Sequence, residues 1–140
     1  MKYKDFMAGR TECPFCGNRQ EELLRLEHAY LTYSLAPYAK HHLLVVTNRH
    51  IESIKDMTPE ETTEVDQLER NALDILTALG HNGTTFLVRE GAGTGKSVPH
   101  LHFHVIPDIP IASVETDARE RSIMTPEEVN ETIADIKKFL

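Results

Sequence analysis

The order of apolar and polar positions along the chain predicts a protein in which short strands outnumber helices. Residues 23–35 alternate loosely between apolar and polar side chains around a central polar pair, which predicts two short strands joined by a tight turn. Apolar runs predict three more strands, at 42–47, 84–88 and 101–106. Because these strands mostly follow one another along the chain, the pattern favours an α+β fold with an antiparallel sheet over a doubly wound parallel fold.

Two Thr-Pro-Glu-Glu sequences, at 58–61 and 125–128, have the signature of a helix start. In each, Thr can cap the helix, Pro suits the first helical position, and Glu stands three residues after Thr, which forms a capping box. After the first box the apolar residues follow helical spacing up to Leu79, and Gly80 stands where the chain must leave the helix. The sequence therefore predicts one long central helix and one C-terminal helix beside roughly five strands.

The length of 140 residues suits a single domain covering 1–140, because the chain shows no internal repeat, no linker and no abrupt change of composition. Hydrophobic residues make up 40% and charged residues 26%, which excludes a disordered or low-complexity chain. The net charge of −7 argues against a nucleic-acid-binding protein, since such proteins hold the phosphate backbone with a broad basic surface. The longest aliphatic run, at 43–46, is too short to cross a membrane, and the first residues lack the apolar stretch of a secretory signal, so we expect a cytoplasmic protein with no membrane partner.

Three histidines, His100, His102 and His104, alternate with apolar residues in the last predicted strand. Successive side chains of a strand point to opposite faces, so the three imidazoles share one face while Leu101 and Phe103 pack into the core. Rings two positions apart on a strand stand ~6.6 Å apart, which suits separate roles along one elongated substrate. An imidazole can attack phosphorus, titrate near neutral pH or ligate zinc, and the alternation alone leaves these roles open.

A glycine-rich loop at 91–97 directly precedes the histidines. Its last three residues suggest a nucleotide-binding P-loop, but Glu90 stands where that motif requires its first glycine, and a proline and a strand follow where a helix is needed. Glycines still permit close approach of the backbone to an anion, and a lysine and a serine add a cation and a hydroxyl. We therefore expect a phosphate-binding loop that uses Gly95, Lys96 and Ser97.

Cys13 and Cys16 have the C-x-x-C spacing of a metal knuckle, with Gly17 directly after them. A thioredoxin-like redox pair would follow a first strand in a βαβ pattern, and no strand is predicted before Cys13. Zinc is therefore favoured over redox chemistry, with two histidines needed to complete a tetrahedral site. Three other histidines, His28, His41 and His81, have no role in these patterns, and we expect them at the surface or in support of other residues.

Together these segments resemble the histidine-triad (HIT) family of nucleotidyl hydrolases and transferases. The resemblance runs from Cys13-x-x-Cys16, through the strand that starts at His42 and the Arg-His-Ile sequence at 49–51, to residues 95–107, where Gly-x-Ser-Val precedes His-x-His-x-His. It implies a sheet of about five antiparallel strands with two helices, a homodimer, and a nucleotide bound along the histidine strand.

The resemblance also implies a role for each residue that matches the family motif. His102 would be the nucleophile that attacks the α-phosphorus and forms a covalent nucleotidyl-histidine, which water then cleaves. His104 would bond the phosphate oxygen of the leaving group, and His42 would orient the triad from a neighbouring strand. Ser97, Lys96 and the loop amides would contact phosphate and stabilise the charge that develops there.

Zinc-carrying members of this family, including the galactose-1-phosphate uridylyltransferase branch, bind metal through a C-x-x-C pair, a histidine after the third strand and the first triad histidine. The matching residues here are Cys13, Cys16, His50 and His100, so the chain resembles a zinc-carrying, bacterial-type member. Four protein ligands leave no open position, which implies a structural zinc that fixes the N-terminal segment against the catalytic strand.

Three positions depart from the common pattern of the family. Lys96 stands where many members carry Gln, Arg89 where Asn or Gln is frequent, and Asp108 where Arg is common. We hypothesise that Arg89 and Lys96 supply the phosphate contacts that amides and the missing arginine give elsewhere.

Three functions follow from these residues. The leading interpretation is a hydrolase, or a nucleotidyl transferase, that attacks a nucleoside α-phosphate, for instance in a dinucleoside polyphosphate or a nucleoside phosphoramidate. A second interpretation makes the three alternating histidines ligands of a catalytic metal that activates water. A third is a nucleotide-binding dimer without catalysis.

Overall fold

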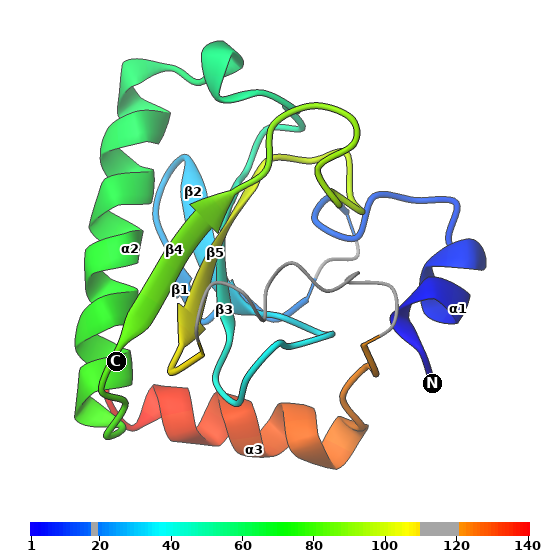
Figure 1. Ribbon diagram of the computed structural model, residues 1–140. Helices are drawn as coiled ribbons and strands as arrows, with labels where there is room; N and C mark the ends of the chain where they lie inside the picture. Colours follow the sequence, from blue (N-terminus) through cyan, green and yellow to red (C-terminus); the bar gives the residue numbers. More distant parts are fainter. Residues whose placement is uncertain (18–19, 110–120) are drawn as a thin grey trace.

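A five-stranded antiparallel sheet forms the centre of the protein (Figure 1). The computed structural model describes residues 1–17, 20–109 and 121–140. The sheet has the order β1-β2-β3-β5-β4, so the last strand lies between the third and the fourth, and every neighbouring pair is antiparallel. The strands are β1 (Leu24–Arg25), β2 (Ala29–Tyr33), β3 (Leu43–Thr47), β4 (Thr84–Val88) and β5 (His102–Pro107).

Both predicted helices form and begin at their capping boxes. The helical segments are α1 (Tyr3–Ala8), the 3-10 helix η1 (Ile54–Asp56), α2 (Pro59–Ala78) and α3 (Pro126–Lys137). In α2 and α3 the side chain of the cap threonine accepts from the backbone N–H of the glutamate. The glutamate carboxylate in turn accepts from the backbone N–H of the threonine. Gly80 follows α2 with a φ of +95°, a left-handed conformation that glycine adopts without strain. No described helix has the length and apolar character needed to cross a bilayer.

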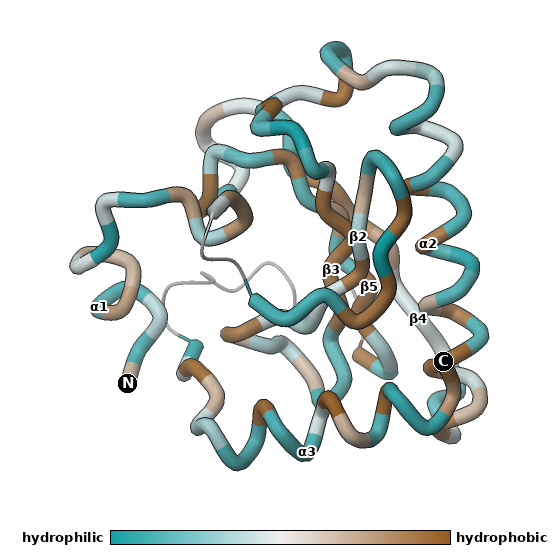
Figure 2. Tube along the Cα trace, turned by 180° about the vertical axis from the view of Figure 1, so that it is seen from behind, coloured by the Kyte–Doolittle hydropathy of each residue, from teal (hydrophilic) through white to brown (hydrophobic). Residues whose placement is uncertain are grey.

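One face of the sheet packs against α2 and α3 and holds the main core. Leu68, Ala72 and Leu76 of α2 are fully buried there against side chains of the central strands, including Leu31 and Val45. Figure 2 shows the apolar positions gathered in β2, β3 and β5, while α2 carries polar positions along much of its length. Removal of this apolar surface from water, at ~25 cal/mol per Å², drives the docking of α2 on the sheet.

The opposite face of the sheet carries the histidines and is covered by the N-terminal segment. In the pairing of β3 with β5, Leu44 lies opposite His104 and Val46 opposite His102. Phe15 packs on Leu44 and Val46 in a second, smaller apolar cluster. In Figure 1, α1 and the segment that follows it lie on the far side of the sheet from α2. The predicted alternation along β5 thus places two histidines under the N-terminal segment.

Two features differ from what the sequence predicts. β5 begins at His102, so His100 and Leu101 precede the strand. The reason is a backbone contact, because the N–H of Leu101 donates to the carbonyl oxygen of Ile51 over 2.7 Å rather than to a neighbouring strand. The helix α1 was not predicted, because its six residues are too few to show an apolar period.

Candidate active site and metal centre

The backbone of His100 holds the ring of His102 in one orientation. Nδ1 of His102 lies 2.8 Å from the carbonyl oxygen of His100. A carbonyl oxygen only accepts, so Nδ1 carries the proton and Nε2 keeps its lone pair. The ring of Phe15 packs beside both imidazoles, with centroid distances of 5.3 Å to His102 and 5.7 Å to His100. His102 therefore presents an unprotonated Nε2.

A line of hydrogen bonds orients His42 and His104. The backbone N–H of Tyr38 donates to Nδ1 of His42 over 3.1 Å, which assigns the proton of that ring to Nε2. Nε2–H of His42 then donates to Nδ1 of His104 over 2.9 Å, so the proton of His104 lies on its own Nε2. Within one pair of rings, whose centroids are 4.9 Å apart, His104 offers a hydrogen-bond donor and His102 a lone pair.

These three rings are nearly buried, and burial keeps them neutral. His42, His102 and His104 are 1%, 8% and 6% exposed. Burial lowers the pKa of His102 to about 4, and the positive charges of Lys96 and Arg89 act in the same direction. Burial likewise holds the pKa of His42 and that of His104 well below the ordinary value for histidine. At neutral pH all three imidazoles are uncharged, as a nitrogen nucleophile must be.

His102 and His104 line a pocket of about 190 Å³ between the sheet and the N-terminal segment. The sequence did not single out the residues that complete its walls, among them Tyr3 of α1 and the arginines Arg10 and Arg121. Tyr3 and Arg10 are more than 80 positions from Arg121 in sequence, and no local pattern links them to it. A pocket that combines neutral imidazoles with guanidinium groups suits a phosphorylated ligand.

The glycine-rich loop distributes its predicted residues between two hollows. Ser97 lines the pocket of the histidines, and its hydroxyl lies 3.2 Å from the hydroxyl of Tyr3. Lys96 lines a neighbouring hollow of about 440 Å³ and donates to the carbonyl oxygen of Glu52 over 2.7 Å. The serine is therefore placed at the pocket, whereas the lysine acts on His102 through its charge.

Arg89 joins the His42 side of the site through Tyr38, which the sequence did not single out. The guanidinium of Arg89 donates to the Tyr38 hydroxyl over 3.3 Å. The Tyr38 ring stacks on His42 at 5.6 Å between centroids, and the Arg121 guanidinium carbon lies 3.4 Å from the centre of the same ring. Gly95 has a φ of +85°, a left-handed conformation that favours glycine, and a Cβ there would be in ordinary contact with Nε of Arg89 at 3.5 Å.

Cys13, Cys16, His50 and His100 converge on one point. Their ligand atoms all lie within 4.8 Å of one another. Nδ1 of His100 lies 3.3 Å from Sγ of Cys13 and 3.2 Å from Nδ1 of His50, and the latter is 3.3 Å from Sγ of Cys16. Tetrahedral zinc with two nitrogen and two sulfur ligands requires ligand–ligand distances of ~3.3–3.8 Å. The four predicted residues therefore fit zinc, with small adjustments of these distances on binding.

The second ring nitrogen of His100 also fits the role of a zinc ligand. Nε2 lies 2.7 Å from the carbonyl oxygen of Thr47, so Nε2 carries the proton and Nδ1 directs its lone pair at the sulfurs. This ring therefore belongs to the cysteine cluster, while Nδ1 of His102 is engaged by a backbone carbonyl. Within the described residues, the three alternating histidines do not form one ligand set, which weighs against a catalytic metal held by all three.

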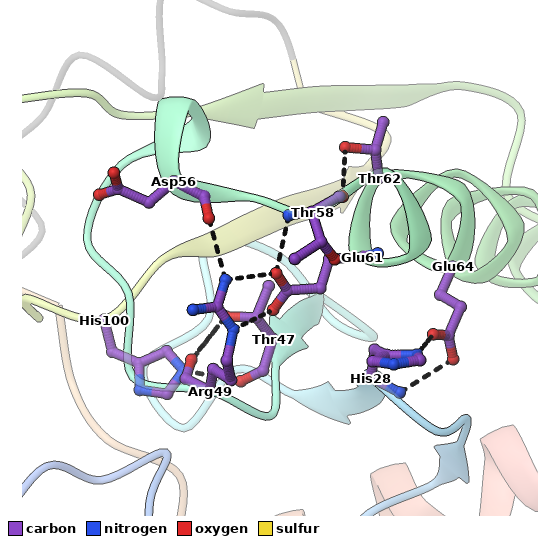
Figure 3. Close-up of polar contacts among 9 residues, drawn as sticks. All are labelled: His28, Thr47, Arg49, Asp56, Thr58, Glu61, Thr62, Glu64 and His100. Atoms are coloured by element: carbon purple, nitrogen blue, oxygen red, sulfur yellow. Dashed lines mark hydrogen bonds and ion pairs between the residues drawn. The ribbon is translucent and has the colours of Figure 1, made fainter.

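A polar network ties the loop that carries His50 to the start of α2 (Figure 3). The Thr47 hydroxyl donates to the carbonyl oxygen of Arg49 over 3.0 Å. The Arg49 guanidinium donates to both carboxylate oxygens of Glu61, at 2.7 and 3.3 Å. Glu61 is 1% exposed and also accepts from the backbone N–H of Thr58 in the capping box. The position of the loop that carries one candidate metal ligand thus depends on the first turn of α2.

The three histidines without a predicted role all contact carboxylates. His28, at the β1–β2 turn, is bound through its backbone N–H and its ring by Glu64 of α2, as Figure 3 shows. His41 and His81 contact each other, and each also contacts an aspartate. His41 is 7% exposed, so it is a buried support rather than a surface residue.

Residues 18–110 match the family model of the HIT domain. The chain belongs to the HIT family. All five histidines of the candidate active site and metal cluster lie within the matched part of this HIT protein, while Cys13 and Cys16 precede it.

Curated relatives of this HIT protein match over part of their length. An uncharacterized HIT-like protein of Methanocaldococcus jannaschii is 31% identical over 81 residues, which cover 58% of this chain and 63% of that protein. The bis(5′-adenosyl)-triphosphatase of Dictyostelium discoideum is 28% identical over 95 residues, which cover 67% of this chain and 64% of that protein. The HIT chain thus spans slightly less than two thirds of these relatives.

Solved structures confirm the HIT-like fold. A diadenosine triphosphate hydrolase of Plasmodium falciparum, in complex with Cyclomarin A, has a TM-score of 0.72 at 19% identity, over 99% of this chain and 96% of that chain. A zinc-bound HIT family protein of Mycobacterium smegmatis has a TM-score of 0.63 at 16% identity, over 97% and 92%. Identities this low establish the shared arrangement of five antiparallel strands, a long central helix and a C-terminal helix.

Proposed function

We propose that this HIT protein hydrolyses or transfers a nucleotide by attack of His102 on a nucleoside α-phosphate. The observation that carries the proposal is the hydrogen bond from Nδ1 of His102 to the His100 carbonyl, because it leaves a lone pair on Nε2 of a ring that lines the pocket. The lowered pKa of His102 keeps that lone pair unprotonated at neutral pH.

The chemistry takes two displacements at phosphorus. First, Nε2 of His102 bonds to the α-phosphorus as the bond from phosphorus to the leaving group breaks. Nε2–H of His104, assigned by its contact with His42, donates a hydrogen bond to the departing atom, which takes up a proton. Second, a water oxygen bonds to phosphorus, the phosphorus–nitrogen bond breaks, and the water loses a proton. The products are the protonated leaving group and a nucleoside monophosphate, and His102 returns to its original state; in transfer, another acceptor replaces water.

Phosphate contacts are proposed for Ser97, Lys96, Arg89 and the amides around Gly95. Ser97 lines the pocket directly. The positive charges of Lys96 and Arg89 already act on the ring of His102, since they lower its pKa. The same charges would stabilise the negative charge that develops on the phosphorus oxygens during attack.

For the substrate we propose a dinucleoside polyphosphate or a nucleoside phosphoramidate. Two similar proteins are named as a bis(5′-adenosyl)-triphosphatase and a diadenosine triphosphate hydrolase. The guanidinium groups of Arg10 and Arg121 in the pocket suit the additional phosphates of a polyphosphate bridge. Arg10 belongs to the N-terminal segment, and Arg121 comes after β5 along the chain, so both are distant in sequence from the glycine-rich loop.

Zinc is the metal proposed for Cys13, Cys16, His50 and His100. The donor set and its distances fit zinc, and a similar HIT structure is zinc-bound. With four protein ligands the metal would be structural, and it would cross-link the N-terminal segment to His50 and to His100, which lies two residues before β5. That segment forms a wall of the pocket, so the cross-link would also shape the pocket.

A homodimer joined along β4 is proposed as the partner state. β4 ends the sheet, and its outer edge is unpaired among the described strands. Phe86 and Val88 on this edge are 42% and 37% exposed. Pairing of two β4 edges would satisfy the backbone groups and cover these side chains. Light scattering should give a dimer for the wild type and a monomer for Val88→Lys; a monomeric wild type would contradict the proposal.

The function is tested by a nucleotide panel combined with mass spectrometry of the protein. In a rapidly quenched single turnover with an α-³²P-labelled substrate, we expect one nucleotidyl group on His102. His102→Asn should neither form the adduct nor turn over substrate, and His28→Gln serves as the matched control at a histidine remote from the pocket. Turnover by His102→Asn would contradict the mechanism. Tight binding without turnover on every nucleotide would instead support the non-catalytic dimer.

A further inference from the structure

Four side chains from separate parts of the fold form a continuous line beside the turn that carries His42. Asp135 of α3 lies 2.8 Å from Nε2 of His41, and Nδ1 of His41 lies 2.8 Å from Nε2 of His81. Nδ1 of His81 lies 2.7 Å from Oδ2 of Asp108, the residue that follows β5. We call these four residues the Asp–His–His–Asp chain. It accounts for two histidines that the proposed function does not use.

The Asp–His–His–Asp chain is complete only when its two rings hold three protons. A carboxylate oxygen accepts, so Nε2 of His41 and Nδ1 of His81 both carry protons. The central contact joins the two remaining ring nitrogens at 2.8 Å, where two lone pairs would repel each other. One of these nitrogens therefore carries a third proton. The two imidazoles then share one positive charge between two negative carboxylates.

At the α3 end, charged neighbours keep Asp135 ionised. The hydrogen bond from His41 lowers the pKa of Asp135, and the charges of Lys138 and Lys40 act in the same direction. Nζ of Lys138 lies 3.5 Å from the second oxygen of Asp135, while Lys40 lies 3.2 Å from Glu131. The carboxylate is therefore an acceptor toward His41.

At the β5 end, the backbone fixes the orientation of Asp108. Its Oδ1 accepts from the backbone N–H groups of Asn82 and Gly83, at 2.9 and 3.0 Å. The hydrogen bond from His81 is the largest of the effects that lower the pKa of Asp108. Oδ2 is thus directed at His81 as an acceptor. The aspartate that stands where the family commonly has arginine is a member of this line.

His41 has an uncommon backbone conformation immediately before His42. Its φ is +69°, in the left-handed region that residues with a Cβ rarely adopt. It closes a turn in which the N–H of His42 donates to the carbonyl oxygen of Ala39 over 3.1 Å. In the same turn the N–H of Tyr38 donates to the ring of His42, which directs the proton of that ring toward His104. A ring of His41 that is anchored on both sides holds this turn.

We propose that His41 and His81 are positioning residues for His42 and act through one proton shared between their rings. The proposal rests on the proposed function, in which His42 orients His104. Without the shared proton, two opposed lone pairs would open the central contact and release the turn. Turnover would then fall, while the substrate-binding residues stay in place.

Asparagine substitutions change the proton count and preserve the shape of the line. In Asp108→Asn the side-chain amide donates to Nδ1 of His81. Nε2–H of His81 then donates to Nδ1 of His41, and Nε2–H of His41 donates to Asp135. Two ring protons then complete the line, and both rings are neutral. Asp135→Asn has the same effect from the other end. In the double variant only one ring proton could complete the line, which would leave one ring an anion, so the line must break.

Ring ¹⁵N chemical shifts count these protons in the intact protein without any substrate. We expect one net positive charge over His41 and His81 in the wild type at pH 7, and none in Asp108→Asn or Asp135→Asn. Two neutral rings in the wild type at pH 7 would overturn the proposal, whatever the activity. His28→Gln, which removes a histidine–carboxylate contact elsewhere, should leave both signals unchanged.

The kinetic arm follows kcat and KM with a substrate from the nucleotide panel. We expect the double asparagine variant and His81→Phe to show about tenfold lower kcat with little change in KM, as for a misplaced catalytic group. Each single asparagine variant, in which the line is still complete, should lose less. His41→Gly accepts the positive φ and so tests the ring apart from the turn, with the same expected loss. Wild-type kcat and KM in His81→Phe and His41→Gly would overturn the positioning role. If the wild type turned over no nucleotide, the proposed function would fail, and the ¹⁵N count would still decide the shared proton.

Discussion

His102 and His100 are joined by one hydrogen bond, 2.8 Å long, from the Nδ1–H of His102 to the backbone carbonyl oxygen of His100. The first residue is the proposed nucleophile, and the ring of the second points at the sulfurs of Cys13 and Cys16. The carbonyl that sets the tautomer of His102 therefore belongs to a proposed metal ligand. In the proposed function, metal binding and orientation of the nucleophile are therefore linked through two residues of backbone.

Removal of the metal should lower both stability and turnover. We expect Cys16→Ser to lose zinc, to unfold at a lower temperature, and to turn over more slowly even where it is still folded, because the backbone at His100 is no longer anchored. Zinc content, thermal unfolding and kcat well below the unfolding midpoint measure the three effects. A chelator-treated protein with no zinc, an unchanged midpoint and full activity would contradict this link.

His104→Asn should slow turnover in a way that depends on the leaving group. Loss of the donor on Nε2 should cost about 10²–10⁴-fold with a poor leaving group that needs a proton. A nucleotide ester of p-nitrophenol, whose leaving group is stable as an anion, should be affected far less. Equal losses on both substrates would show that His104 does not assist departure. The comparison is made on kcat, with KM measured in parallel.

Lys96→Gln and Arg89→Asn should weaken phosphate handling without changing the fold. Both cations lower the pKa of His102, so their removal should raise that pKa. Nucleotides with more phosphate charges should show the largest loss of affinity. The measurements are KM and kcat across nucleotides with different numbers of phosphates, together with the thermal midpoint. Unchanged kinetics on every nucleotide would remove both residues from the site.

The ion pair and the helix cap that share Glu61 can be separated. Glu61→Gln keeps a residue that can complete the capping box but removes the charge that holds Arg49, so we expect zinc affinity to fall about 10–100-fold because the His50 loop is less well held. Thr58→Ala keeps the ion pair and removes the cap, at a cost of about 1 kcal/mol of unfolding free energy. Zinc titration and denaturant unfolding of both variants measure the two effects. Equal zinc affinity in the two variants would show that the ion pair does not support the metal.

The buried neutral histidines should make the protein sensitive to acid. His42 and His104 have a lowered pKa in the folded state and the ordinary value near 6.5 when unfolded. Below that value the unfolded chain binds more protons, so stability is full above it and falls as the pH drops, by about 1.4 kcal/mol per pH unit for each histidine. Urea unfolding between pH 7.5 and 5 measures the slope. His104→Asn should remove one histidine's contribution to the slope of unfolding free energy against pH. An unaltered slope in this variant would show that His104 is not kept neutral by burial.

Short-range physics made most of the fold predictable. The capping boxes at Thr58 and Thr125 start their helices as expected, and the predicted strand at 84–88 has the bounds of β4, because both signals depend on contacts within a few residues. The four candidate metal ligands and the alternation of His102 and His104 were predicted from the sequence, through spacing and a family resemblance, and the structure brings the four candidates together. Their convergence on one point depends on the sheet, which pairs β3 with β5.

The tertiary structure alone decided which polar groups meet. Arg121 and α1 line the pocket without any local signature, since the other walls lie far away in the sequence. Tyr38, beside His42, likewise meets Arg89 and Arg121 only across long sequence separations. His41 meets Asp135 across 94 positions and His81 across 40, contacts that form only after α3 and the α2–β4 connection dock on the sheet. A sequence determines its helices, strands and reactive residue types through local geometry, whereas the proton carried by each imidazole is set by partners that only packing brings within hydrogen-bond distance.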